Sequence, residues 1–154
     1  MKSFEIRKDD LTAEATRALL AEHFQRMRVG SPPGHSFALD LAGLSESNVT
    51  VWTAWDDSTI AGVAAFNDLG NGFGELKSMR TASSHLRQGV AAKLLAHIID
   101  EARRSGFRRL SLETGRGENF DAAVAFYRKQ GFIDGDAFAD YVRSDFNQFL
   151  HLDL

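Results

Sequence analysis

One segment constrains the fold of this chain more than any other, because a strand, a polar loop and a long amphipathic helix follow one another between residues 75 and 106. Glu75 to Thr81 is predicted as a strand. Gly89 to Ser105 carries an apolar stripe at helical spacing, and Gly106 stands where a helix C-cap belongs. A strand that leads into such a helix needs a sheet covered by helices, which indicates an α/β fold.

The rest of the chain supplies more elements of both kinds. Further strands are predicted at Ser3–Lys8, Val49–Trp55, Ile60–Phe66, Arg108–Thr114, Ala137–Val142 and Asn147–Leu152. Further helices are predicted at Leu11–Arg28 (with Thr12 as a possible cap), Phe37–Leu44 and Phe120–Gln130. The resulting order, β-α-α-β-β-β-α-β-α-β-β, predicts a mixed, mostly antiparallel central sheet with flanking helices. No repeat, linker or shift in composition divides the chain, so residues 1–154 are expected to form a single domain.

Composition excludes several classes of protein. The net charge of −3 disfavours a protein that coats nucleic acid and leaves room for a cationic substrate such as an amine. The absence of cysteine rules out disulfides and a thiol nucleophile, and the five histidines show no paired ligand spacing, so no metal site is expected. Neither a signal peptide nor a membrane-spanning run is visible, and a cytoplasmic location without membrane association is expected.

The loop before the long helix has the features of a phosphate site. The first helical turn holds the small residues Gly89, Ala91 and Ala92, so a phosphate can approach its free backbone N–H groups and the positive end of the helix dipole. Arg87 and Gln88 can add side-chain donors. A glycine before a helix also serves ordinary tight turns, so the loop alone leaves both interpretations open.

With the second half of the chain added, the sequence resembles the GNAT (GCN5-related N-acetyltransferase) superfamily, in particular a subgroup of small bacterial members of mostly unassigned acceptor. The resemblance rests on the strand Glu75–Thr81, the loop Leu86–Ala91 opening a helix, the strand Arg108–Thr114, and the run Phe126–Phe132, in which Tyr127 precedes Gly131-Phe132. The preceding β-α-α-β-β order also fits, so nearly the whole chain is covered. Leu86 and Phe120 depart from the family pattern, which has Gln or Arg and, in many members, Asn at these positions.

The resemblance implies that acetyl-CoA is the cosubstrate and lies between the fourth and fifth strands, which separate at a bulge. The pantetheine amides would pair with the backbone of Met79, Arg80 and Thr81. The pyrophosphate would bind the N–H groups of Arg87, Gln88, Gly89, Val90, Ala91 and Ala92. Because Leu86 cannot donate a side-chain hydrogen bond, this contact should rest on backbone groups and Arg87.

Acetyl transfer to an amine needs a base for the amine and an acid for the leaving thiolate. Tyr127 matches the family's thiol-protonating tyrosine, although it could simply pack in the core. Glu75 is the first candidate base, because it precedes Gly89 by the spacing that histone-type members use; a solvent-facing strand residue is the alternative. Glu113, at the end of its strand, is the rival: it could bind the acceptor's charge or merely finish the strand.

The acceptor is the least specified part of the prediction. Ser31 and Pro32, between the first two helices, and Tyr141, near the C-terminus, are candidate substrate contacts, with loop and packing roles as alternatives. A small-molecule primary amine attacked directly in a ternary complex is expected, and a homodimer is possible. The competing functions are an acyl-CoA-binding regulatory module with little catalysis and a protein N-terminal or lysine acetyltransferase.

Overall fold

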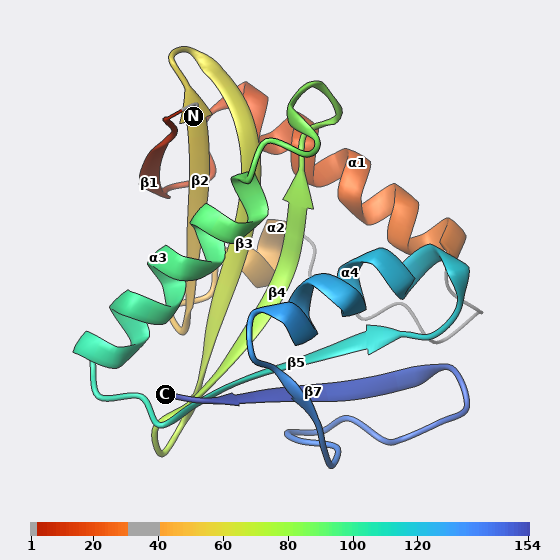
Figure 1. Ribbon diagram of the computed structural model, residues 1–154. Coiled ribbons are helices and arrows are strands. Elements are labelled where there is room, and N and C mark those ends of the chain that lie inside the picture. Colours follow the sequence, from red (N-terminus) through yellow and green to blue (C-terminus); the bar gives the residue numbers. More distant parts are fainter. Residues whose placement is uncertain (1–2, 31–40) are drawn as a thin grey trace.

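The computed structural model describes residues 3–30 and 41–154, which form a mixed sheet covered by helices (Figure 1). The strands are β1 (Glu5–Asp9), β2 (Val49–Asp56), β3 (Thr59–Gly70), β4 (Phe73–Thr81), β5 (Arg109–Gly115), β6 (Ile133–Asp134) and β7 (Asn147–Asp153). The helices are α1 (Glu14–Gly30), α2 (Leu41–Leu44), a 3-10 turn (Ser83–His85), α3 (Val90–Arg104) and α4 (Glu118–Lys129). The predicted fold class and the order of the main elements are confirmed.

The sheet has the strand order β1-β2-β3-β4-β5-β7-β6, and every pair is antiparallel except β4 with β5. The parallel pair is where the long connection through α3 returns the chain to the sheet, as such a crossover requires. The turn between β3 and β4 uses Gly70, Asn71 and Gly72, all at positive φ. Asn71 and Gly72 form the tip of this hairpin, between the end of β3 and the start of β4.

Apolar clusters hold helices to both faces of the sheet. On one face, Leu19 and Leu20 of α1 and Leu44 of α2 pack on Val51 and Val63. The other face carries α3 and α4. Alternation along the strands separates the two sets, because neighbouring strand residues point to opposite faces. Trp52 packs beside His97 of α3, whereas Trp55 belongs to the cluster under α1, so the two tryptophans face opposite sides of the sheet.

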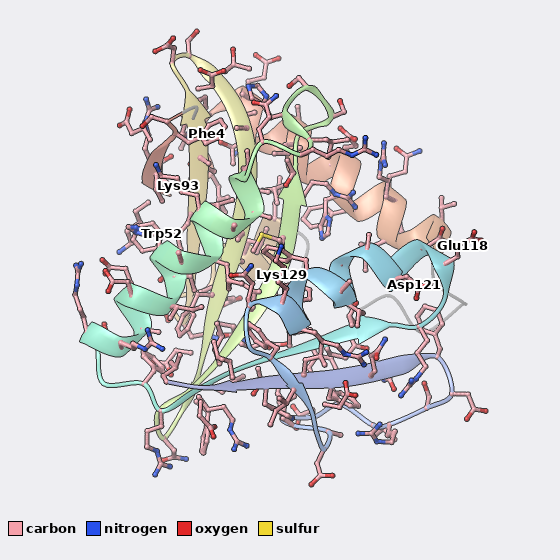
Figure 2. The ribbon with its side chains drawn as sticks, in the orientation of Figure 1. Phe4, Trp52, Lys93, Glu118, Asp121 and Lys129 are labelled. Carbon is pink, nitrogen blue, oxygen red and sulfur yellow. The ribbon has the colours of Figure 1, made fainter. Side chains whose placement is uncertain are left out.

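The charged residues of α4, the helix at the edge of the cleft described below, are distributed so that they stabilise the helix. Glu118 and Asp121 lie in its first turn and Lys129 in its last turn, at opposite ends of the helix in Figure 2. Acidic groups near a helix N-terminus and basic groups near its C-terminus stabilise the helix dipole.

None of the helices in residues 3–30 and 41–154 is long and apolar enough to cross a membrane.

Three sequence predictions need correction. The strand predicted at Ala137–Val142 is wrong: this segment is irregular, Ala139 has a φ of 51°, and the short strand beside β7 is Ile133–Asp134 instead. Helix α1 begins at Glu14 and not at Leu11, because Leu11 has a φ of 67° and its N–H donates to Asp9. Thr12 therefore caps nothing; it hydrogen-bonds to Asp10.

The second predicted helix is only partly testable. Its described part is the short helix Leu41–Leu44, and residues 37–40 lie outside the described residues.

Candidate active site

The site begins where two neighbouring strands separate. β4 pairs with β5 only from Phe73 to Glu75, and beyond that point the strands diverge, as Figure 1 shows. In the same stretch the register of β4 on β3 shifts between Lys77 and Arg80, and Ser78 has a φ of 55°. This bulge bends β4 away from β5. One edge of β4 is thereby left without a strand partner, and its backbone groups are open to a ligand.

A cleft of about 220 Å³ occupies this opening, and residues from β4, β5, α1, α4 and the segment after β6 line it. It brings together six of the predicted site residues: Glu75, Met79, Arg80, Glu113, Tyr127 and Tyr141. Thr81 ends β4 outside this lining. Ser31 and Pro32 lie outside the described residues.

Glu75 is buried, and both of its carboxylate oxygens accept hydrogen bonds. One carboxylate oxygen accepts a hydrogen bond from the Asn67 amide at 3.2 Å, and the other accepts one from the Tyr141 hydroxyl. The Lys77 ammonium lies 3.5 Å from the second oxygen and donates to the Tyr141 hydroxyl at 2.6 Å. A buried carboxylate needs such partners. Burial, followed by the neighbouring Glu75 carboxylate, raises the pKa of Tyr141, so this hydroxyl keeps its proton.

Glu113 lies in a different environment. Burial raises the pKa of its carboxyl to about 7; a hydrogen bond with Asn147 and the charge of Lys77 act in the opposite direction, and the Glu75 carboxylate adds to the rise. A carboxyl that titrates near neutral pH can accept a proton and release it under ordinary conditions. Glu113 thus has a carboxyl that titrates near neutral pH, whereas the Glu75 carboxylate is held in a hydrogen-bond network.

Tyr127 enters the cleft from α4. Its ring is buried and packs against Phe132 and Phe126, which fixes the direction of the side chain. Its hydroxyl makes no hydrogen bond within residues 3–30 and 41–154. Burial raises the pKa of Tyr127 to about 12, so the hydroxyl stays protonated at neutral pH and can donate to a ligand.

The bulge in β4 leaves a polar atom without a partner. The Ser78 hydroxyl oxygen is buried and forms no hydrogen bond with any described residue, although Ser78 is among the residues that line the cleft. A buried polar group without a partner costs about 1–3 kcal/mol. The backbone edge of β4 beside this bulge has no β5 partner beyond Glu75, so this part of the cleft fits an amide-bearing chain such as pantetheine. The sequence gives no sign of it, because Ser78 resembles any polar strand residue.

The loop before α3 has the geometry of an anion site. Arg87 and Gly89 adopt left-handed φ values of 61° and 82°, and Gly89 caps α3 without any side-chain hydrogen bond. The first α-helical bond joins the Lys93 N–H to the Gly89 carbonyl, so the N–H groups before it have no helical partner. Strained residues of this kind are typical of ligand loops. The exposed loop fits the pyrophosphate of acetyl-CoA.

Just before this loop lies a group of three side chains that sequence reasoning missed. The Ser84 hydroxyl is 2.7 Å from Nδ1 of His85, and Nε2 of the same ring is 3.0 Å from the Asp56 carboxylate at the end of β2. His85 is buried against Phe4. These contacts fasten the end of the β4–α3 connection to the β2–β3 turn. Asp56 and His85 are far apart in the sequence, and no local pattern joins them.

The arrangement offers no sign of a bound metal. Among the described residues, no three or more His, Cys, Asp or Glu side chains are placed to hold a metal ion.

Comparison with known proteins agrees with this geometry. Residues 8–132 match the acetyltransferase (GNAT) family. The chain is 45% identical over 151 residues to the uncharacterized N-acetyltransferase YedL of Escherichia coli, which covers 98% of this chain and 95% of that protein. It is 45% identical over 136 residues to the uncharacterized N-acetyltransferase YsnE of Bacillus subtilis, at 88% and 90% coverage. A crystal structure of a candidate acyl-CoA N-acyltransferase of Klebsiella pneumoniae superposes with a TM-score of 0.84 at 26% identity, covering 100% and 99% of the two chains.

Proposed function

The chain belongs to the GNAT family and is an acetyl-CoA-dependent N-acetyltransferase, and from that premise we propose that its acceptor is a small molecule with a primary amine. The observation that carries this proposal is the pair of carboxyl groups, Glu75 and Glu113, in one cleft with Tyr127. Glu113 can attract an ammonium group, whereas the charge of Glu75 is balanced by Lys77 at 3.5 Å. Their different environments give each a separate task.

Glu113 acts as the base. A primary ammonium has an ordinary pKa of about 10.4 and must lose its proton before its nitrogen can attack. Burial places the pKa of Glu113 near 7, which lets it take that proton directly or through water. Glu75 has both oxygens occupied, so it serves to position Tyr141 and Lys77.

Tyr127 provides a proton to the leaving thiolate, whereas Glu113 takes a proton from the amine. Acetyl-CoA supplies the activated acetyl group when it is bound. The hydroxyl of Tyr127, protonated at neutral pH and without a partner among the described residues, can donate to a developing thiolate. Backbone N–H groups on the free edge of β4 can donate to the oxygen that gains charge during attack.

The size of the cleft supports a small acceptor. Its volume of about 220 Å³ is below the roughly 300–1,000 Å³ of sites that hold drug-sized ligands. The Tyr141 side chain, held by Glu75 and Lys77, forms part of its wall. A long peptide would need an open groove, which favours a small amine over a protein substrate.

The proposal is tested by CoA release with a panel of small primary amines and of short peptides carrying a free N-terminus or a lysine. We expect turnover with small amines, and a rate that rises with pH through a value near 7. Turnover with peptides alone would contradict the small acceptor. Tight acetyl-CoA binding with no turnover of any amine would instead support a regulatory module.

A further inference from the structure

The cleft contains a positively charged side chain, Arg80, that has no role in the reaction proposed above. Arg80 projects from β4 towards α1, and its Nε donates a hydrogen bond to Nδ1 of His23 at 3.2 Å. His23 is buried, and this burial, together with the Arg80 charge, lowers its pKa to about 4. The imidazole is therefore a neutral acceptor that orients the guanidinium.

The two terminal nitrogens of Arg80 have no hydrogen bond or ion pair within residues 3–30 and 41–154. The nearest acidic group on α1, Glu22, is paired with Arg26 at 3.3 Å. Desolvation, followed by the charge of Arg26, lowers the pKa of Arg80, and the charge of Glu22 acts in the opposite direction. A half-buried cation beside a second cation is costly unless an anion joins it.

The position of Arg80 shows where such an anion would lie. Arg80 and His23 line the same cleft as Glu113, and Arg80 also lines an adjoining hollow beside α1. The cleft thus has an acidic end at Glu75 and Glu113 and a basic end at Arg80.

We infer that the acceptor carries a carboxylate as well as its amine, and that Arg80 binds this carboxylate while the amine faces Glu113. This inference rests on the proposed function and names its substrate class: an amino acid. A guanidinium presents parallel N–H donors that match a carboxylate, and His23 leaves its outer nitrogens free for that purpose. Arg80 is then a specificity-determining residue.

The competing use of Arg80 is a phosphate of acetyl-CoA. The loop at Arg87–Ala92 already offers an anion site at the start of α3, and α3 covers the sheet face opposite α1. Arg80 reaches α1, as its bond to His23 shows. Its side chain is therefore on the acceptor side, and the experiment below separates the two roles.

The test compares acceptors in matched pairs. Each amino acid, from glycine to 6-aminohexanoate and including L-methionine, is paired with its own carboxamide, and kcat/KM is measured for both at saturating acetyl-CoA. Wild-type protein should prefer the carboxylate form of its best acceptor by about 10- to 100-fold, as a charge-assisted pair allows. In Arg80→Gln the ratio should fall to near one, and in Arg80→Lys it should be intermediate. The matched control Arg26→Gln should keep the ratio within about threefold, because Arg26 is already paired.

Binding provides a second readout that does not depend on turnover. Titration calorimetry of the same pairs into the protein–CoA complex should show tighter binding of the carboxylate, and Arg80→Gln should abolish the difference. Equal binding of acid and carboxamide to wild-type protein overturns the inference, even if amines are acetylated and the proposed function stands. A raised KM for acetyl-CoA in Arg80→Gln, with an unchanged acceptor ratio, also overturns it and assigns Arg80 to the cofactor.

Discussion

The loop at Arg87–Ala92, which we expect to bind the pyrophosphate, and the acidic end of the cleft, which holds Glu75 and Glu113, are built differently. The loop at Arg87–Ala92 is a short contiguous segment, largely exposed, that offers backbone N–H groups. The acidic end is assembled from β4, β5 and the segment after β6, and its tasks are carried by side chains, with Tyr141 bonded to Glu75 from 66 residues away. A backbone site tolerates varied side chains, whereas a side-chain site depends on each group.

This difference accounts for the variation at Leu86. Its side chain is exposed, and the N–H groups of the following residues do not depend on it. A change at Glu75 would instead leave Tyr141, Lys77 and Asn67 without their common partner. Binding at the loop should therefore be lost only through changes that alter its backbone or its charge. The function of the acidic end should be lost through the change of a single side-chain atom.

The largest effect is expected from Gly89→Glu. A carboxylate at the N-cap of α3 would repel the pyrophosphate and occupy its position, so affinity for acetyl-CoA should fall by at least about 100-fold. Calorimetric titration measures the loss. The matched control is Gly106→Glu: both glycines have left-handed φ values, and a Cβ added at either one meets no atom within 4 Å. Gly106→Glu should bind acetyl-CoA normally, and equal losses in both variants would show that backbone strain is responsible.

Glu113→Gln should have the next largest effect. Without its base the cleft should lose about 100-fold in kcat/KM for the amine. The wild-type rate should rise between pH 6 and 8, because Glu113 must be ionised and its pKa lies near 7, and this rise should vanish in the variant. Loss of the rise in Glu75→Gln, with Glu113→Gln retaining it, would make Glu75 the base.

The same substitution should change stability in a pH-dependent way. Burial favours protonated Glu113 in the folded state, so the folded state loses stability as pH rises from the unfolded pKa towards and through 7. Glu113→Gln should therefore unfold at a higher temperature than wild type at pH 8, with little difference at pH 4. Differential scanning calorimetry at the two pH values provides the measurement.

Tyr127→Phe should lower kcat by about 10- to 100-fold while KM for acetyl-CoA changes little, because only a proton donor is removed from a ring that still packs. Steady-state kinetics separates the two constants. Tyr141→Phe is a natural comparison, since the chain contains two tyrosines. A Tyr127→Phe enzyme with wild-type kcat would assign Tyr127 to packing alone.

Tyr141→Phe should have the smallest effect on rate. The variant removes one of the hydrogen bonds to buried Glu75 and the acceptor for Lys77, which should cost about 1–3 kcal/mol of unfolding free energy. The acceptor KM should rise a few fold, and acetyl-CoA binding should stay unchanged. Chemical denaturation and kinetics measure both. Unchanged stability would show that the network contributes nothing to the fold.

The elements that the sequence predicted well are those encoded by short contiguous patterns of residues. Helix α3, the left-handed Gly106 that follows its C-cap Ser105, and the loop before it follow from contiguous patterns, and the resemblance extended them to most of the sheet. The pairs Glu75–Tyr141, Arg80–His23 and Asp56–His85 escaped prediction, because each joins residues far apart in the chain. The expected strand at Ala137–Val142 failed for a related reason: Phe138 packs on Phe149 and His151 from an irregular backbone, and apolar alternation does not reveal that.

The hydrogen bond between His85 and Asp56 has a consequence for how the enzyme binds its cosubstrate. A loop that has already lost its freedom when the chain folds does not lose it again on binding, so less of the affinity for acetyl-CoA is lost to ordering. The His85 amide, which donates to the Ala82 carbonyl at 2.9 Å, should accordingly exchange its hydrogen slowly in the unliganded protein. Acetyl-CoA would then bind to a site that was shaped during folding.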